Sequence, residues 1–209
     1  MSSNFIKIYY TLFTFVVLLV LYSYFQLDKI ILDYIYHQWG NPMIPFGAIH
    51  TFSQIGKSTW YIVGGILAYI IWRDRNPTIA KASLYILSTT IVSGILTNII
   101  KVIFGRARPA LYIEDHIYGF SWFNIDVVYR SFPSGHSTTA MAIAMGFALL
   151  LPKYRIWFIT LGITIALSRV VLTEHYLSDV IAGGFLGSSS SLILYHIFYH
   201  RDERDRDEL

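Results

Sequence analysis

The chain has 209 residues, of which 55% are hydrophobic and only 14% are charged, and its formal net charge is +3. A soluble domain usually carries about 25% charged residues, so this composition excludes a soluble globule. It also excludes a disordered chain, and the absence of cysteine excludes a disulfide scaffold. The sequence therefore predicts a helical protein embedded in a membrane.

Apolar windows recur along the chain, several of them close to the roughly 20 residues that a helix needs to cross a bilayer. We predict an all-α, polytopic membrane protein with six transmembrane helices in a single membrane-embedded domain, residues 1–209. The spans are expected at approximately 6–27, 58–72, 82–104, 136–151, 155–172 and 178–199. The first window is too long and too aromatic for a signal peptide, so we expect it to be retained.

Residues 28–57 join the first two predicted spans and mix apolar with charged side chains. Apolar residues recur near helical spacing at the start of this segment, with charged residues such as Asp28 and Asp33 between them. That pattern predicts an interfacial helix lying against the bilayer. Pro and Gly residues around Asn41–Gly47 then indicate a turn region.

The distribution of Lys and Arg between alternate loops predicts the orientation. Both termini and the loops at 73–81 and 153–155 share a side with nine such residues, against seven on the other. Three of those seven residues are assigned below to a binding site, so the orientation depends on nine residues against four. We therefore expect both termini in the cytoplasm, with the protein in the cytoplasmic (inner) membrane. The final residues Arg206–Leu209 resemble an endoplasmic-reticulum retrieval signal, but on that side we interpret them as a solvated tail.

Ionisable residues near a membrane are costly and usually functional. A first cluster, with Lys101 and Arg108, stands at the outer end of the third span, where snorkelling of cations is the alternative interpretation. A second cluster, Ser134, Gly135 and His136, opens the fourth span. Backbone N–H groups at a helix start form a ready anion site. The alternative there is a simple N-cap by Ser134.

A third cluster joins the last two spans and contains Arg169, Glu174, His175 and Asp179. His175 and Asp179 are four residues apart, so a helix would place them on one face. The carboxylate could then hold one imidazole nitrogen and fix the tautomer of the other. A local capping pair is the alternative, and the role of Glu174 stays open.

The predicted topology brings all three clusters to the outer face. Together they offer three cations, two histidines, a carboxylate and a helix N-terminus. Cations and N–H donors suit a phosphate, whose negative charge is spread over several oxygens. A metal site would need more anionic or neutral ligands and fewer cations, so we expect neither a metal nor another cofactor.

The pattern Lys-x6-Arg-Pro, Pro-Ser-Gly-His and Ser-Arg-x5-His-x3-Asp resembles the three-part signature of type 2 phosphatidic acid phosphatases. Its parts stand at residues 101–109, 133–136 and 168–179, with no departure at a signature position. This lipid phosphate phosphatase superfamily also includes vanadium haloperoxidases, and the chain is similar to its small, bacterial-type integral membrane members. The family's membrane architecture would extend over nearly the whole chain.

The resemblance implies a role for each signature residue. His175 would attack the phosphorus and form a phosphohistidine, with Asp179 holding its ring. His136 would protonate the leaving oxygen and then help to activate water. The remaining signature residues would bind the phosphate oxygens. They are Lys101, Arg108, Ser134, Gly135 and Arg169.

The sequence thus predicts a metal-independent phosphatase acting on a membrane lipid phosphate or diphosphate at the periplasmic or extracellular face. The motifs contact the phosphate and not the rest of the lipid. The candidate substrates that the resemblance implies are undecaprenyl diphosphate, phosphatidylglycerophosphate, phosphatidic acid and lipid A phosphate. The expected partners are the substrate and membrane lipids, without nucleic acid, and the oligomeric state is open. Two alternatives remain: a lipid phosphotransferase using the same site, and a non-catalytic lipid-binding or transport protein.

Two further features have no assigned chemistry. The loop 111–130 is aromatic, which is typical either of a lid that contacts the lipid or of anchoring at the membrane interface. The remaining histidines lack a partner at a meaningful spacing, and we interpret them as interfacial polar residues. They are His37, His50, His116, His196 and His200.

Overall fold

The computed structural model describes residues 3–39 and 47–199, and within these ranges it is helical, with an isolated β-bridge but no strand. The α-helices are α1 (Ser3–Tyr22), α2 (Asp28–Trp39), α3 (Gly47–Ser53), α4 (Ser58–Trp72), α5 (Pro77–Phe104), α6 (Pro109–Asp115), α7 (Gly135–Leu150), α8 (Arg155–Val171) and α9 (Leu177–Tyr199). Short 3₁₀ turns stand at Gln54–Gly56, Val127–Tyr129 and Pro152–Tyr154. The predicted turn before residue 47 and the tail from residue 200 lie outside the described ranges.

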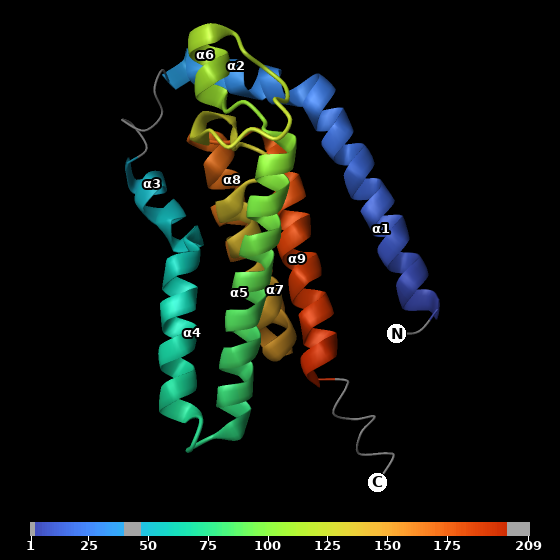
Figure 1. Cartoon of the computed structure of the whole chain (residues 1–209), viewed down its shortest axis with the longest axis vertical. Coiled ribbons are helices and arrows are strands. Elements are labelled where there is room, and N and C mark those ends of the chain that lie inside the picture. The colour runs from blue at the N-terminus through green and yellow to red at the C-terminus, as the bar shows by residue number, and fades with distance from the viewer. Residues whose placement is uncertain (1–2, 40–46, 200–209) are drawn as a thin grey trace.

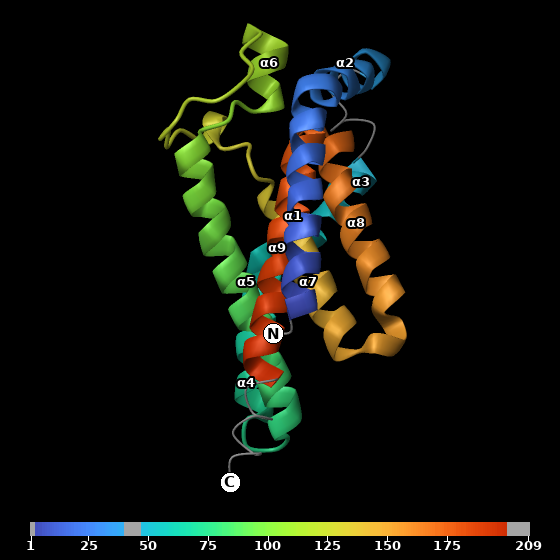
Figure 2. The same ribbon diagram turned by 90° about the vertical axis from the view of Figure 1, so that its right-hand side faces the viewer.

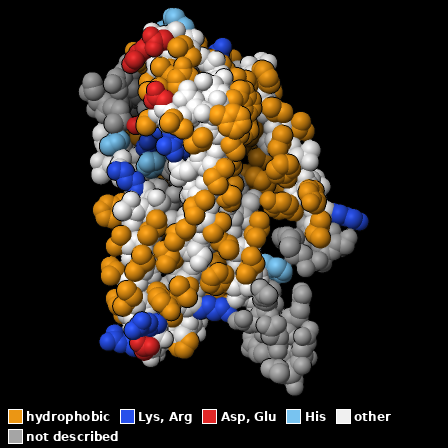
Figure 3. All heavy atoms as spheres, in the orientation of Figure 1, with side chains coloured by type: hydrophobic (Ala, Val, Ile, Leu, Met, Phe, Trp, Pro, Cys, Tyr) orange, Lys and Arg blue, Asp and Glu red, His pale blue; other side chains and the backbone are white. Residues whose placement is uncertain are grey.

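Four helical stretches among the described residues are long and apolar enough to cross a membrane. They are Ile6–Trp39, Pro77–Phe104, Pro152–Val171 and Leu177–Tyr199. Between 6% and 33% of each apolar window is buried inside the protein, so most of that surface faces outward, where lipid can cover it. Hydrophobic side chains accordingly cover the flanks of the bundle (Figure 3). The chain is therefore an all-helical integral membrane protein.

Two shorter apolar helices, α4 and α7, stand at the second and fourth predicted spans. Helices thus lie at all six predicted ranges, although only the longer four meet the length needed to cross a bilayer. Figures 1 and 2 show α4, α5, α7, α8 and α9 running roughly alongside one another. That six helices span the membrane stays a prediction.

The first span and the expected interfacial helix form one continuous helical stretch. A π-helical segment, Ser23–Leu27, joins α1 to α2 without a break. In Figure 1, α1 runs down one side of the bundle, where it packs on α9, and α2 lies across the top of the bundle near α6. A position for α2 in the membrane interface is still a prediction.

Helix α5 leads directly into the polar end of the bundle, and both of its ends are fixed by local chemistry. It begins where the Asn76 side chain accepts hydrogen bonds from two backbone N–H groups, with Pro77 as the first helical residue. It ends at Gly105, whose φ of 53° is left-handed. A Cβ atom at Gly105 would collide with the backbone carbonyl oxygen of Ser121. The glycine therefore lets the chain turn sharply after Phe104, one helical turn beyond Lys101.

Helix α7 is the inner helix and packs closely on α9. Small residues dominate its buried surface, including Thr138 and Ala142. A Cβ atom at Gly187 would overlap the Thr138 carbonyl oxygen, so the two backbones approach where α9 has no side chain. This close packing fixes the start of α7 beside the start of α9, where the predicted site residues lie.

Candidate active site

The end of α5, the start of α7 and the α8–α9 loop meet at the upper end of the bundle in Figure 1. Backbone hydrogen bonds connect these segments. The Ser134 N–H group, before α7, donates to the Asp179 carbonyl oxygen in α9 at 3.0 Å. The Ser131 N–H group donates to the Arg106 carbonyl oxygen, after α5, also at 3.0 Å. Residues from all three signature segments are thereby brought together.

His175 and Asp179 are close, but not because they share a helix. His175 lies in the α8–α9 loop, and Asp179 lies in the first turn of α9. The His175 Nδ1 atom is 3.6 Å from Asp179 Oδ2, which is too long for a hydrogen bond. The Ser131 hydroxyl donates to the same Oδ2 atom at 2.6 Å and lies 3.4 Å from Nδ1. This arrangement turns Nδ1 toward the carboxylate and leaves Nε2 on the other side of the ring.

The buried position of His175 controls its charge. Burial lowers the pKa of His175 to about 3, although Asp179 opposes this shift, and the cations Lys101 and Arg108 lower it further. The imidazole is therefore neutral at neutral pH. A neutral ring has one nitrogen with a free lone pair, which a nucleophile requires.

Glu174 lies between two of the predicted phosphate-binding cations. Its Oε2 atom is 3.2 Å from Arg169 Nη2 and 3.6 Å from Arg108 Nη1. Arg169 also donates from Nη1 to the Ser53 hydroxyl at 2.8 Å, and Arg108 donates from Nε to the Val127 carbonyl oxygen at 3.1 Å. The structure thus brings Arg108 and Arg169 to one carboxylate, whose role the sequence left open.

Lys101 and the start of α7 form another side of the site. The Lys101 ammonium donates to the Arg130 carbonyl oxygen at 2.6 Å. Ser134 is the N-cap of α7, and its hydroxyl oxygen accepts from the Ser137 N–H group at 3.4 Å and from the Ser137 hydroxyl at 2.8 Å. Gly135 begins the helix, and a Cβ atom there would lie 3.9 Å from the Lys101 side chain. Both interpretations of this segment, N-cap and anion site, are compatible with that geometry.

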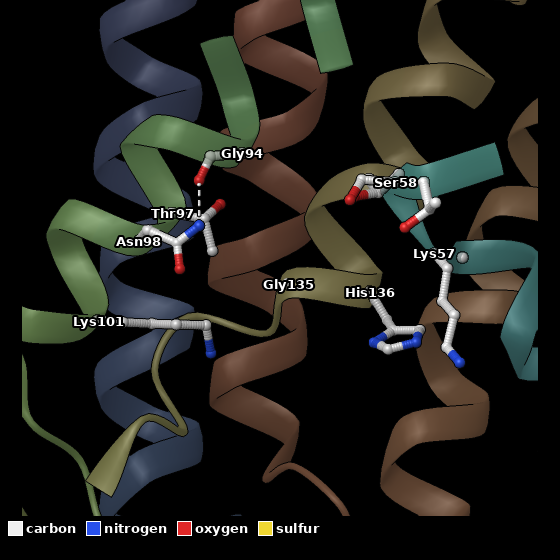
Figure 4. A pocket seen from close by; sticks show the side chains of 11 residues that line it. Lys57, Ser58, Gly94, Thr97, Asn98, Lys101, Gly135 and His136 are labelled. Atoms are coloured by element: carbon white, nitrogen blue, oxygen red, sulfur yellow. Dashed lines mark hydrogen bonds between the residues drawn. The ribbon is translucent and has the colours of Figure 1, made fainter. Parts of the chain in front are cut away.

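A cavity of about 340 Å³ opens between the starts of α4 and α7 and the last turns of α5. Lys101 and His136 lie on either side of Gly135 along it, and Lys57 extends beside His136 (Figure 4). The Nε2 atom of His136 is buried without a hydrogen-bond partner in the described part of the chain. A buried nitrogen without a partner is free to meet a group that enters the cavity.

Arg106 and Asp28 also belong to the site, although the sequence assigned neither residue to it. Arg106 Nη1 lies 2.5 Å from Asp179 Oδ1, and Nη2 lies 2.7 Å from Asp28 Oδ2. All three side chains are fully buried. Burial opposes the charged state of Arg106, but Asp179 and Asp28 raise its pKa above the ordinary value, so the guanidinium stays charged. Asp28 is therefore not on a water-facing side of an interfacial helix.

The residues brought together here suit an anion better than a metal ion. Arg108 and Arg169 meet at one half-buried carboxylate, that of Glu174, and Lys101 lies close enough to Arg108 for their charges to interact. Among the residues that the structure describes, no group of three or more His, Cys, Asp and Glu side chains is placed to hold a metal ion. The basic surplus is typical of a site for phosphate oxygens.

The aromatic loop 111–130 is attached to α5 at one side and exposed at its tip. Phe120 packs on Phe104 with ring centroids 5.7 Å apart, and Trp122 packs on Phe104 at 5.1 Å. Phe123 and Ile125 are 74% and 78% exposed. Both expected roles, a lid and an interfacial anchor, stay predictions.

The chain matches known proteins over the segment that contains these residues. Residues 82–203 match the sequence family described as the PAP2 superfamily. The chain is similar to proteins named lipid A 1-phosphatase from Rhizobium johnstonii (36% identical over 158 residues, 70% of this chain) and Rhizobium etli (43% over 153 residues, 68% of this chain). The matched region covers 65% and 66% of those relatives' own lengths, which is just under two thirds.

The fold is similar to the crystal structure described as the first transmembrane PAP2 type phosphatidylglycerolphosphate phosphatase, from Bacillus subtilis. The TM-score is 0.64 at 21% sequence identity, and the likeness covers 93% of this chain and 95% of the other. At this identity the likeness bears on the fold alone. The sequence-family match, in contrast, covers more than half of the chain and includes the three motif segments. This chain therefore belongs to the PAP2 superfamily.

Proposed function

We propose that the chain is a lipid phosphate phosphatase that works through a phosphohistidine at His175. The observation that carries this proposal is a buried, neutral His175 whose Nδ1 atom faces Asp179 and Ser131, beside a cluster of cations. Membership of the PAP2 superfamily and the names of the Rhizobium relatives support the same activity. The neutral ring provides a nucleophile, and the cations provide a place for phosphate.

The reaction proceeds in two displacements. In the first, His136 acts as an imidazolium, the charged form that a bound phosphate anion beside it favours. His175 Nε2 forms a bond to phosphorus while the bond from phosphorus to the lipid oxygen breaks, and the His136 imidazolium gives its proton to that oxygen. In the second, water attacks the phosphorus, the bond to His175 breaks, and His136 takes a proton from the water. Asp179 stabilises the positive charge that the His175 ring acquires when it carries the phosphoryl group.

The cations hold the phosphate oxygens during both displacements. Negative charge on these oxygens attracts Lys101, Arg108 and Arg169, and the Ser134–Gly135 segment adds N–H donors. In the structure, the Glu174 carboxylate stands between Arg108 and Arg169, as the phosphate would. No metal takes part in this scheme, because the protein's own cations balance the charge of the phosphate.

The membrane placement is also a proposal. The whole chain, residues 1–209, forms one domain of six spans in the cytoplasmic membrane, with both termini in the cytoplasm. The site then faces the periplasm or the cell exterior, because α5 ends and α7 begins on the side opposite the termini. A lipid headgroup would reach the site from the membrane plane while its acyl chains stay in the bilayer.

Lipid A phosphate is the first substrate to test. Three relatives carry the name lipid A 1-phosphatase, including a more distant one from Porphyromonas gingivalis. The neighbouring structure from Bacillus carries a different substrate name, phosphatidylglycerolphosphate. Undecaprenyl diphosphate and phosphatidic acid complete the panel, because the motif residues contact phosphate alone.

The deciding experiment measures phosphate release by the purified, detergent-solubilised protein on these four lipids. We expect turnover of at least one lipid, insensitive to EDTA and inhibited by vanadate. His175→Ala should abolish release, whereas His37→Ala, an exposed histidine of α2, should not. Normal turnover by a folded His175→Ala variant would contradict the nucleophile assignment. Labelled phosphate on an acceptor lipid would identify a phosphotransferase, and no turnover on the whole panel would favour a non-catalytic lipid-binding protein.

A further inference from the structure

Arg106 forms a fully buried link between two carboxylates on different helices. Its guanidinium binds Asp179 of α9 through Nη1 and Asp28 of α2 through Nη2. Each interaction is a short, charge-assisted hydrogen bond, at 2.5 and 2.7 Å. The planar guanidinium has donors in fixed directions, so it sets the positions of both carboxylates together.

Asp28 is held from every side. The Ser178 backbone N–H group donates to its Oδ1 atom at 3.0 Å, and the Ser178 hydroxyl donates to Oδ2 at 2.5 Å. The Ser23 hydroxyl donates to Oδ1 at 2.9 Å. Ser178 directly precedes Asp179 in α9, so Asp28 contacts the helix start that carries the orienting carboxylate. Both Asp28 oxygens and both Arg106 Nη atoms thus have partners, whereas Arg106 Nε has none among the described residues. Buried polar contacts of this kind favour one arrangement of the groups that make them.

Aromatic rings keep water away from this network. The Arg106 Cζ atom lies 4.3 Å from the centroid of Tyr176 and 4.9 Å from that of Tyr24. Cations are attracted to ring faces, and a site without water strengthens each ion pair. Removal of one partner would leave a buried charge without compensation. The carboxylate that remained would then have to move or change its contacts.

Asp179 has a second set of contacts that face the predicted nucleophile. Its Oδ2 atom accepts from the Ser131 hydroxyl at 2.6 Å and from the Tyr176 N–H group at 3.0 Å, and it lies 3.6 Å from His175. Its Oδ1 atom faces Arg106 instead. A change at Arg106 therefore rotates or shifts the carboxylate whose other oxygen faces His175.

We propose that Arg106 and Asp28 are positioning residues, which fix the Asp179 carboxylate and through it the His175 ring. The inference rests on the proposed phosphatase function. It extends the site beyond the family-matched residues 82–203 to the first helical stretch, where Asp28 lies. Neither residue touches the phosphate; both act through Asp179.

The test compares kcat, KM and phosphoenzyme formation in three single variants and one double variant. We expect Arg106→Met to lower kcat about 100-fold, because a misplaced reacting group costs that much, and Asp28→Asn to lower it about tenfold. KM should stay within about threefold of wild type, since the phosphate-binding cations are untouched. Arg106→Lys, which keeps one ion pair, should recover part of the loss. The double variant should resemble Arg106→Met alone, because both residues act through one carboxylate.

Matched controls are Asp33→Asn, on the same helix as Asp28, and Arg155→Met, exposed at the opposite end of the bundle. Both should keep wild-type kcat. A merely structural role would lower thermal stability and yield while the folded fraction kept its kcat, and that result would overturn the proposal. If Arg106→Met does not fold, two milder variants replace it in the measurement: Asp28→Asn keeps the shape of the Asp28 side chain, and Arg106→Lys keeps the buried positive charge. Wild-type protein without turnover would instead reject the phosphatase function itself.

Discussion

The two ends of the helical bundle bury polar groups in different ways. At the site end, Arg106 joins two carboxylates in a network of charges. At the other end, Tyr85 packs in an apolar core with Ile86 and Ile143, and its hydroxyl lies 2.6 Å from the Ser191 hydroxyl as a neutral pair. Charges hold a specific geometry, whereas close van der Waals packing of apolar side chains holds helices together. Changes at the first end should therefore reduce activity, and changes at the second should reduce stability.

Among changes at the site end of the bundle, Asp179→Asn should cause the largest loss of activity. An amide has the shape of the carboxylate but not its charge, so Arg106 loses one anionic partner and the His175 ring loses its stabilising charge. We expect kcat to fall roughly a thousandfold. The measurement is single-turnover phosphoenzyme formation with the best lipid of the panel. A loss of less than tenfold would show that Asp179 does not support the nucleophile.

Glu174→Gln should have a smaller effect, and a favourable one: it should strengthen the binding of phosphate at the site. Its carboxylate lies 3.2 Å from Arg169 and 3.6 Å from Arg108, where it competes with an incoming phosphate. The neutral amide removes that repulsion, so the inhibition constants for inorganic phosphate and vanadate should fall about three- to tenfold. An increase in both constants would mean that Glu174 organises the two arginines rather than competing for them.

The smallest expected effect is on stability, from a change at the opposite end of the bundle. Tyr85→Phe removes a hydroxyl that bonds to Ser191 and keeps the ring in the core, so it should lower the free energy of unfolding by about 1 kcal/mol. The kcat should remain unchanged. Thermal unfolding in detergent, with activity measured on the same samples, checks both statements. A loss of activity without a loss of stability would show that the two ends are coupled.

Apolar windows located the helices well, but charges were a poor guide to where helices end. The window 82–104 begins after Lys81, whereas α5 begins at Pro77, because Asn76 caps it there. Lys81 does not stop the helix, since its ammonium lies over the Tyr199 ring at 4.8 Å. Likewise, the first helical stretch continues through Asp28, whose charge has a partner inside the bundle. Local capping and distant partners decide these boundaries.

The signature predicted candidate residues for phosphate chemistry, and their roles stay a prediction, but it did not predict the contacts that hold them. Spacing suggested that His175 and Asp179 share a helix face, whereas the structure joins a loop residue to a helix start. Ser131 has no motif spacing relative to either residue, and Asp28 is separated from Arg106 by 78 positions. A single sequence contains no local pattern for such long-range contacts. The available signal was the position of Asp28, a carboxylate that directly follows a charge-free window.

The link between Asp28 and Arg106 also has a consequence for how the protein is made. Chains emerge from the ribosome from the N-terminus, so Asp28 is synthesised well before the arginine and serine that neutralise and bind it. A carboxylate near an apolar helix is costly to leave in lipid without a partner. The charge of Asp28 gains Arg106 once the third predicted span has been made, but its contacts with Ser178 and the packing of α1 on α9 can form only after the last helix has been inserted. Assembly of the membrane domain and completion of the site become the same event.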